Sequence, residues 1–283
     1  MIDVFDFFSG CGGTSLGFQR KGFNILGGLD FDRDCASTFV KNFPGCHFIQ
    51  GDIRTIETSA LSGIISKQRE KPLLFCGCAP CQPFTKQRRI IPENDERRSL
   101  LSEFQRFIEY WLPDYIFLEN VPGLQKIKKS DQVFKRFTDA LKKLEYKFDY
   151  GTVKASDIGV PQVRQRFILI AARGAYSILP IDHIINKNRT TVPTVRECIE
   201  DLPPIPAGGG CPTIPNHVSA TLSTLNLNRI KLTPEGGDRR DWPDEMKAGC
   251  HQNYKGHTDV YGRMKWDAPA STLTTRCISY SNG

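Results

Sequence analysis

Short apolar runs, glycine-containing turns and helical patterns alternate along the first part of the chain. Residues 3–8 are predicted to form a strand, a glycine turn follows at 9–13, and residues 14–21 suit a helix. The alternation continues, with strands predicted at 24–29, 73–76, 115–118 and 167–172 and helices at 34–43, 99–111 and 132–144. Strands that alternate with helices of this length predict an open, mostly parallel α/β sheet covered on both faces.

The pattern changes after about residue 178. Six prolines and the run Gly208–Gly210 lie between Pro180 and Asn216, and such sequence cannot continue a regular helix or a central strand. The residues that follow are rich in glycine, hydroxyl groups and arginine, without long apolar periods. We therefore predict a catalytic and cofactor-binding domain at 1–178 and a loop-rich recognition region at 179–283.

The composition is that of a globular protein with a small basic excess. The 283 residues suffice for one large domain with a smaller appendage. The 38 basic and 31 acidic residues give a net charge of +7, which suits a polyanionic partner without identifying one. The N-terminus carries acids where a signal peptide carries lysines, no apolar run could span a membrane, and the ten cysteines form no repeating framework. We expect a soluble, cytoplasmic protein with reduced thiols and no membrane partner.

Acidic residues follow the ends of consecutive predicted strands. The turn that begins at Phe8 lets the backbone approach a ligand, and the helix start behind it can bind an anion. Asp30 could accept both hydroxyls of a ribose, with Phe31 beside it as a face for a purine, and Asp52 ends a third strand. Each acid alone is more typical of a helix cap or a solvated turn. In series they indicate a nucleoside ligand with an anionic tail.

The most specific local pattern is CGCAPCQPFT at residues 76–85, directly after a predicted strand. Cys78 and Cys81 have the spacing of a zinc-ligand pair, but no second pair with metal spacing follows and no thioredoxin-like pattern surrounds them. A cysteine held between Pro80 and Pro83 suits a nucleophile. We therefore expect Cys81 to attack a substrate, and we expect no metal site.

A carboxyl group and two arginines at later strand ends complete the candidate site. Glu119 closes a predicted strand within the sequence LENV, and a buried carboxyl there could donate or share a proton with a heterocycle. Arg164 and Arg166 lie within QVRQR, where alternate residues of a strand point the same way. One of them could hold a base carbonyl or a phosphate while it steadies Glu119.

FSGCGG, GCAPCQPF, LENV and QVRQR occur in the order and approximate spacing of the motifs of DNA (cytosine-5) methyltransferases, so the chain from Asp3 to Arg173 resembles that family's catalytic domain. The resemblance implies a Rossmann-like fold and S-adenosylmethionine as cofactor, with S-adenosylhomocysteine as product. It implies a cofactor site made of Phe8, Ser9, Gly10, Gly12, Asp30, Phe31, Asp52, Ile53, Pro80 and Leu100. It also implies that Cys81 adds to C6 of cytosine, and that the catalytic site further contains Glu119, Arg164 and Arg166.

The expected substrate is a short sequence in duplex DNA. Neither reacting atom of cytosine can be reached inside a duplex, so the base must be extruded. The predicted DNA contacts are polar or basic side chains beside the nucleophile and in the recognition region, namely Gln82, Arg88, Arg89, Arg239, Arg240, Arg263 and Arg276. The sequence from 180 to 283, with HTDVYGR and WDAPA, resembles the recognition regions of bacterial restriction-modification methyltransferases. Methylation of transfer RNA stays open as an alternative, because one branch of the family acts on transfer RNA and shares a loop like CQPFT.

Complete family members continue beyond a sequence like that at 281–283 with a further recognition helix and with blocks resembling RELARLQGFP and GN[SA]VP. The second block completes the cofactor site in those proteins, and neither block occurs in the 283 residues. One hypothesis is therefore a split methyltransferase, in which a separate polypeptide supplies these blocks and the present chain, inactive alone, binds DNA and cofactor. The other is a shortened form of a longer protein.

Overall fold

The computed structural model describes residues 1–80, 100–124, 133–249 and 261–273. It divides the chain into two compact units. The first consists of Met1–Val153 and Gln165–Lys187, and the second of Lys154–Arg164 and Asn188–Gly283. We predicted a boundary at residue 178, whereas the first unit extends to Lys187 and the segment before β7 joins the second unit.

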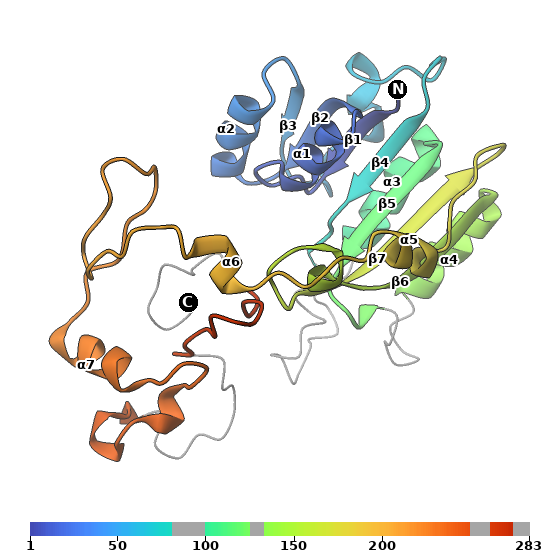
Figure 1. The fold of residues 1–283 in the computed structure, drawn as a ribbon. Helices are drawn as coiled ribbons and strands as arrows, with labels where there is room; N and C mark the ends of the chain where they lie inside the picture. Colours follow the sequence, from blue (N-terminus) through green and yellow to red (C-terminus); the bar gives the residue numbers. More distant parts are fainter. Residues whose placement is uncertain (81–99, 125–132, 250–260, 274–283) are drawn as a thin grey trace. The chain divides into compact units, whose positions relative to one another are not determined.

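A seven-stranded sheet forms the centre of the first unit, with strand order β3-β2-β1-β4-β5-β7-β6 (Figure 1). Its strands are β1 Asp3–Phe7, β2 Asn24–Asp30, β3 His47–Gln50, β4 Leu73–Gly77, β5 Tyr115–Asn120, β6 Tyr146–Lys154 and β7 Gln165–Arg173. The pairs from β3 through β5 are parallel, and β7 runs antiparallel to β5. Parallel strands carry their carboxyl ends to one edge, so the turns after β1, β2, β4 and β5 collect at the same edge of the sheet.

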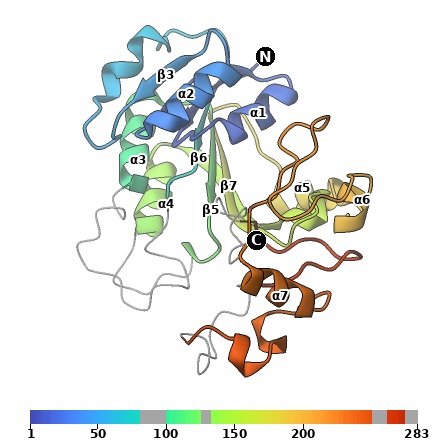
Figure 2. The ribbon, with the colours of Figure 1, turned by 90° about the vertical axis from the view of Figure 1, so that its left-hand side faces the viewer.

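Helices cover both faces of this sheet. They are α1 Gly13–Arg20, α2 Arg33–Asn42, α3 Leu100–Trp111 and α4 Val133–Lys143, with the short α5 Ile181–Lys187 beside β7. In Figure 2, α3 and α4 lie on one side of the sheet and α1 on the other. Phe5 and Phe7 of β1 point to the α3 side, whereas Val4, which precedes Phe5, faces the other way and packs with Phe39 of α2. Both faces of the central strands are buried, which confirms the predicted Rossmann-like α/β class.

The helices and strands predicted for the first 173 residues are confirmed to within two residues at each end. β6 was not predicted from the sequence, because it carries charged and glycine residues and is half-exposed along most of its length. For β3 no bounds were predicted, and only Asp52 beyond its end was identified from the sequence.

The second unit contains short helices joined by long loops. Among its described residues these are α6 Val195–Ile199, α7 Thr224–Leu232 and three short 3-10 turns at Ala155–Ile158, Arg239–Asp241 and Asp244–Met246. Its small core includes Trp242, which is 3% exposed and donates its indole N–H to the hydroxyl of Thr233 at 2.8 Å. Arg229 lies over the Trp242 ring at 5.1 Å and donates to the carbonyl of Met246 at 2.8 Å. Polar contacts supply much of what holds this unit together.

A carboxyl group lies buried inside the first unit. Asp6 of β1 is fully buried, and one of its oxygens accepts a 2.6 Å hydrogen bond from the hydroxyl of Ser15 in α1. Its other oxygen has no hydrogen-bond partner among the described residues. Burial raises the pKa of Asp6 to about 6, and the nearby Asp30 carboxylate adds to this shift.

Asp6→Asn is expected to remove part of the pH dependence of stability. Between about pH 4 and pH 6 the folded protein holds a proton on Asp6 that the unfolded chain has released. The free energy of unfolding therefore falls as pH rises through this window, by about 3 kcal/mol from this group. Urea unfolding of the wild-type protein and Asp6→Asn at several pH values in this window measures the difference between their free energies of unfolding. The contributions of the other carboxylates are the same in both proteins and cancel in this difference. Parallel pH profiles in the two proteins would contradict the assignment.

Candidate active site

The glycine turn after β1 has an unusual backbone. Phe8, Gly10 and Gly12 have φ values of 59°, 52° and 89°, all in the left-handed region that favours glycine. A Cβ on Gly12 would collide with the ring of Phe43 in α2, so a larger residue does not fit there. The hydroxyl of Ser9 in this turn is buried without a hydrogen-bond partner among the described residues. The turn is thus a close-packed cradle in front of the start of α1.

Asp30 at the end of β2 holds this turn in place. Its carboxylate oxygens accept the backbone N–H groups of Gly10 at 2.8 Å and of Asp32 at 3.0 Å. Beside it, Phe31 is 72% exposed, which is unusual for a large aromatic residue. A carboxylate with free lone pairs next to an open ring fits an adenosine, with hydroxyl groups on Asp30 and the base on Phe31.

The turn after β3 is fixed by α3. Arg106 donates to the carbonyls of Ile53 at 2.8 Å and of Ile56 at 2.9 Å, and Ile53 is buried in the core. The carboxylate of Asp52 is bound through both oxygens by Arg54, and these hydrogen bonds lower the pKa of Asp52. A base that reaches Asp52 therefore meets a carboxylate already shared with a guanidinium. Leu100, which was also predicted to line the pocket, begins α3 and packs half-buried against the core.

The segment that leads to Cys81 is tied to the ends of β1 and β5. The buried Asn120 donates from its side-chain amide to the carbonyl of Ala79 at 3.0 Å. The N–H of Cys78 donates to the carbonyl of Phe7 at 3.3 Å. Pro80 is exposed, and Cys81 lies outside the described residues. Pro80, the residue before the predicted nucleophile, thus follows the end of β4 at the carboxyl edge of the sheet.

Glu119 forms an ion pair with Arg166 across β5 and β7. Nε of Arg166 lies 2.7 Å from Oε1 of Glu119, and the two side chains are 24% and 28% exposed. The pair follows from register, because Glu119 faces Ile168 on the antiparallel strand and Arg166 is the diagonal neighbour on the same face. The Glu119 carboxyl, which we expected to be buried, is therefore partly exposed and paired with the Arg166 guanidinium. Asn120, the next residue of β5, was not identified from the sequence. Its side chain points to the opposite face and binds the carbonyl of Ala79 in the loop after β4.

Arg164 belongs to the second unit, where its loop is paired with a distant segment. Its carbonyl accepts the N–H of Ala155 at 2.7 Å, and Val163 donates to the carbonyl of Ala270 at 2.8 Å. Gln162 and Ala270 form an isolated parallel bridge. Residues of WDAPA therefore fix the start of QVRQR, a contact between sequence motifs that the sequence analysis did not foresee.

The predicted DNA contacts of the second unit differ in exposure. Arg239 is 3% exposed, too buried to reach DNA, so that prediction is corrected. It packs close enough to Asp238 to help lower the pKa of that carboxyl, for which the main cause is Arg240. The Arg240 side chain is 69% exposed. Arg263 is also exposed, and one of its N–H groups donates to the carbonyl of Thr233 at 3.0 Å. The other predicted contacts lie outside the described residues, namely Gln82, Arg88, Arg89 and Arg276.

The described ranges contain no group of three or more His, Cys, Asp or Glu side chains that could hold a metal ion. Within the same ranges, no helix has the length and apolar character needed to cross a membrane.

Comparison with known proteins identifies the family. The family model of C-5 cytosine-specific DNA methylases matches residues 2–281. The type II methylase M.HgiDII of Herpetosiphon aurantiacus is 36% identical over 283 residues, which cover 99% of this chain and 77% of that protein. The type II methyltransferase M.AquIA of Picosynechococcus sp. is 30% identical over 247 residues, which cover 79% of this chain and 95% of that protein.

Solved structures show the same fold. A crystal structure described as a prophage-encoded DNA modification methyltransferase of E. coli superposes with a TM-score of 0.73 at 21% identity, covering 96% of this chain and 82% of that one. The S. pombe Dnmt2 methyltransferase superposes with a TM-score of 0.59 at 20% identity, covering 72% of this chain and 62% of that one. Sequence motifs, sheet order and relatives agree, and the chain belongs to the C-5 cytosine-specific DNA methylases.

Proposed function

We propose that this chain transfers the methyl group of S-adenosylmethionine to C5 of a cytosine in a specific duplex DNA sequence, through a covalent adduct with Cys81. The observation that carries the proposal is the Glu119–Arg166 ion pair of 2.7 Å at the end of β5. The next residue, Asn120, holds Ala79 of the segment that leads to Cys81. A carboxyl group and a nucleophile for one base would thus be supplied from adjacent strand ends.

Cys81 and Glu119 would divide the chemistry between them. C5 of cytosine is a poor nucleophile, and addition of the Cys81 thiolate to C6 moves electron density onto C5. Negative charge then develops toward N3, where Glu119 holds or shares a proton. When bound, S-adenosylmethionine supplies the electrophilic methyl group. Loss of the C5 proton then expels Cys81 and restores the aromatic ring.

The cofactor residues fit this proposal. The cradle at Phe8–Gly12 suits the methionine end of S-adenosylmethionine. Asp30 suits its ribose, and the exposed ring of Phe31 suits its adenine. S-adenosylhomocysteine would be left in the same site as product. Arg166 keeps the Glu119 carboxyl oriented at the edge where the extruded base would enter.

The cytosine must leave the duplex to reach Cys81, as in other base-flipping methyltransferases. We propose Gln82, Arg88 and Arg89 as contacts beside the flipped base. Arg240, Arg263 and Arg276 are the proposed contacts of the recognition region.

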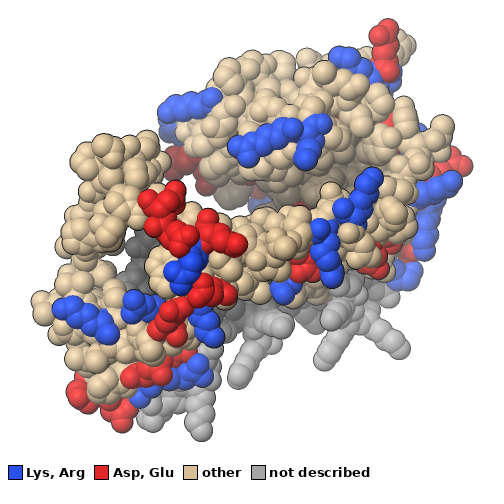
Figure 3. All heavy atoms as spheres, in the orientation of Figure 1, with Lys and Arg blue, Asp and Glu red and all other residues tan. Residues whose placement is uncertain are grey.

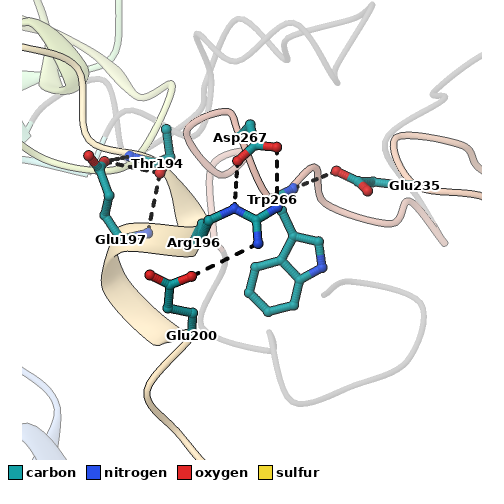
Figure 4. Close-up of polar contacts among 7 residues, drawn as sticks. All are labelled: Thr194, Arg196, Glu197, Glu200, Glu235, Trp266 and Asp267. Atoms are coloured by element: carbon teal, nitrogen blue, oxygen red, sulfur yellow. Dashed lines mark hydrogen bonds and ion pairs between the residues drawn. The ribbon is translucent and has the colours of Figure 1, made fainter.

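Part of the second unit is unsuited to DNA. Acidic side chains gather on the face over α6 (Figure 3). Figure 4 shows Arg196 at the centre of this cluster, 2.6 Å from Asp267 and 3.9 Å from Glu200. The backbone N–H of Trp266 donates to Glu235 at 2.7 Å. Because Arg196 is already paired with carboxylates of this cluster, we propose that DNA binds a different face of the unit.

Asp30→Ala is expected to weaken binding of S-adenosylmethionine by about 1–3 kcal/mol, because the ribose hydroxyls lose their acceptors. The glycine turn also loses the bond from Gly10. Isothermal calorimetry with the cofactor alone measures the change. Asp34→Ala in α2, with an exposed carboxyl, is the matched control and should bind as tightly as the wild-type protein. Equal affinity of Asp30→Ala and the control would refute the ribose contact.

Tritium transfer tests the substrate class. The chain is incubated with methyl-labelled S-adenosylmethionine and either duplex DNA of mixed sequence or transfer RNA. We expect label in DNA, recovered as 5-methylcytosine at one short sequence. Label recovered in RNA alone would replace this proposal with RNA methylation.

A further inference from the structure

Two thiols that the proposed reaction does not use face each other at the edge of the candidate cofactor site. The sulfur atoms of Cys11 and Cys35 are 3.8 Å apart. Cys11 is exposed in the glycine turn, and Cys35 is partly exposed in the first turn of α2. The structure thus brings together two cysteines that are 24 residues apart in the sequence.

The backbone around both cysteines is held in place. The carbonyl of Cys11 accepts a 3.2 Å hydrogen bond from the side-chain amide of Asn42, at the other end of α2. The N–H of Cys35 donates to the helix-capping carboxylate of Asp32 at 3.1 Å. On the other side of Cys11, packing against Phe43 fixes Gly12. The two sulfur atoms therefore meet because their backbones are fixed, and a shift of about 2 Å would bring them to the length of a disulfide bond.

We propose that Cys11 and Cys35 form a site of reversible oxidation, at which a peroxide converts the two thiols into a disulfide. The thiolate of Cys11 attacks a peroxide oxygen and the O–O bond breaks, which leaves a sulfenic acid on Cys11 and hydroxide; the hydroxide takes up the proton that the Cys11 thiol released and becomes water. The sulfur of Cys35 then attacks the Cys11 sulfur, the S–O bond breaks, and hydroxide leaves with the Cys35 proton as water. In total the two thiols lose two hydrogen atoms, and their two electrons reduce the peroxide. A dithiol reductant reverses the reaction.

The surroundings assign different roles to the two thiols. Burial raises the pKa of Cys35 to about 12, and the adjacent Cys11 thiol and the carboxylates of Asp32 and Asp30 act in the same direction. Cys35 therefore keeps its proton at neutral pH. Cys11 is the more exposed of the two residues, and its position suits the first attack, with Cys35 as the resolving thiol.

Oxidation would act on the cofactor site, and this consequence rests on the proposed function. Cys11 lies between Gly10, which binds Asp30, and Gly12, which packs on α2. Closing the disulfide draws the glycine turn toward the start of α2 and changes its position relative to Asp30 and Phe31. We expect the oxidised protein to bind S-adenosylmethionine at least about tenfold more weakly, a loss of about 1.4 kcal/mol.

Stepwise hydrogen peroxide treatment of the full chain tests the covalent step, with intact mass and peptide mapping as readouts. The wild-type protein should lose the mass of two hydrogens and yield a linked Cys11–Cys35 peptide, which dithiothreitol reverses. Cys35→Ser should stop at a sulfenic acid on Cys11, captured by dimedone, and Cys11→Ser should yield no link. Cys198→Ser, which removes an exposed thiol of α6, should behave as the wild-type protein does. Absence of the linked peptide at peroxide concentrations that oxidise Cys198 would overturn the proposal.

Calorimetry with S-adenosylmethionine on reduced and oxidised protein tests the consequence separately. The wild-type affinity should fall on oxidation and recover with dithiothreitol. In Cys11→Ser, peroxide treatment should leave the affinity at the value that this variant has before treatment. A disulfide that forms without a change in affinity would overturn the link to the cofactor. Reduced protein that fails to bind S-adenosylmethionine would instead count against the proposed function and leave the oxidation site standing.

Discussion

Cys81→Ser is expected to lower methyl transfer by several orders of magnitude while it leaves the affinity for S-adenosylmethionine nearly unchanged. A serine hydroxyl stays protonated at neutral pH and adds to a pyrimidine far less readily than a thiolate does. The loss should therefore fall on the chemical step and not on cofactor binding. Tritium transfer to DNA measures the first quantity, and calorimetry with the cofactor measures the second.

Trapping on DNA that contains 5-fluorocytosine isolates the covalent step. Fluorine at C5 cannot leave as a proton does, so the wild-type adduct persists and migrates with DNA on a denaturing gel. Cys78→Ala is the matched control from the same segment, because its sulfur lies 3.6 Å from the hydroxyl of Thr14 and takes no part in the proposed chemistry. The control should form the adduct. A trapped complex that survives in Cys81→Ser would show that another group is the nucleophile.

The first unit was predictable because its strands are buried on both faces. Burial on both faces leaves β4 as a continuous apolar run and β1 as an apolar run interrupted by the buried Asp6, and glycine turns mark where they end. β6 escaped prediction because it is half-exposed and carries lysines and a glycine, so neither an apolar run nor a clear alternation identifies it. The helices of the second unit are short, and proline-rich sequence surrounds them, so periodicity had too few turns to detect them.

The site was predictable as far as motifs place residues at strand ends. Parallel topology then requires Asp30, Glu119 and the segment before Cys81 to share an edge, as the described residues do. Contacts between segments distant in sequence were not predictable, such as that of Asn120 with Ala79. Nor could charge alone distinguish Arg239, which is turned into the unit, from exposed Arg240 beside it.

Glu119→Gln is expected to slow methyl transfer by about 10²-fold or more, the usual scale for loss of a positioned acid or an oxyanion-type donor. A glutamine amide keeps the size of the side chain but cannot hold and release a proton at N3. The loss should appear in kcat, since the amide can still contact the base. Folding should change little, because the Arg166 side chain is 24% exposed and water can solvate a guanidinium that loses its partner.

Glu103→Gln separates catalysis from the loss of an ion pair. Glu103 pairs with Arg106 at 3.0 Å on α3, with side-chain exposures of 23% and 35%, so it matches the Glu119–Arg166 pair in type and exposure. Its removal should leave kcat within about twofold, as expected for a partly exposed pair that contributes at most about 1 kcal/mol to stability. Single-turnover rates with saturating DNA and cofactor measure both variants. If Glu119→Gln turns over as fast as Glu103→Gln, another group must supply the proton at N3, and the ion pair with Arg166 would be structural.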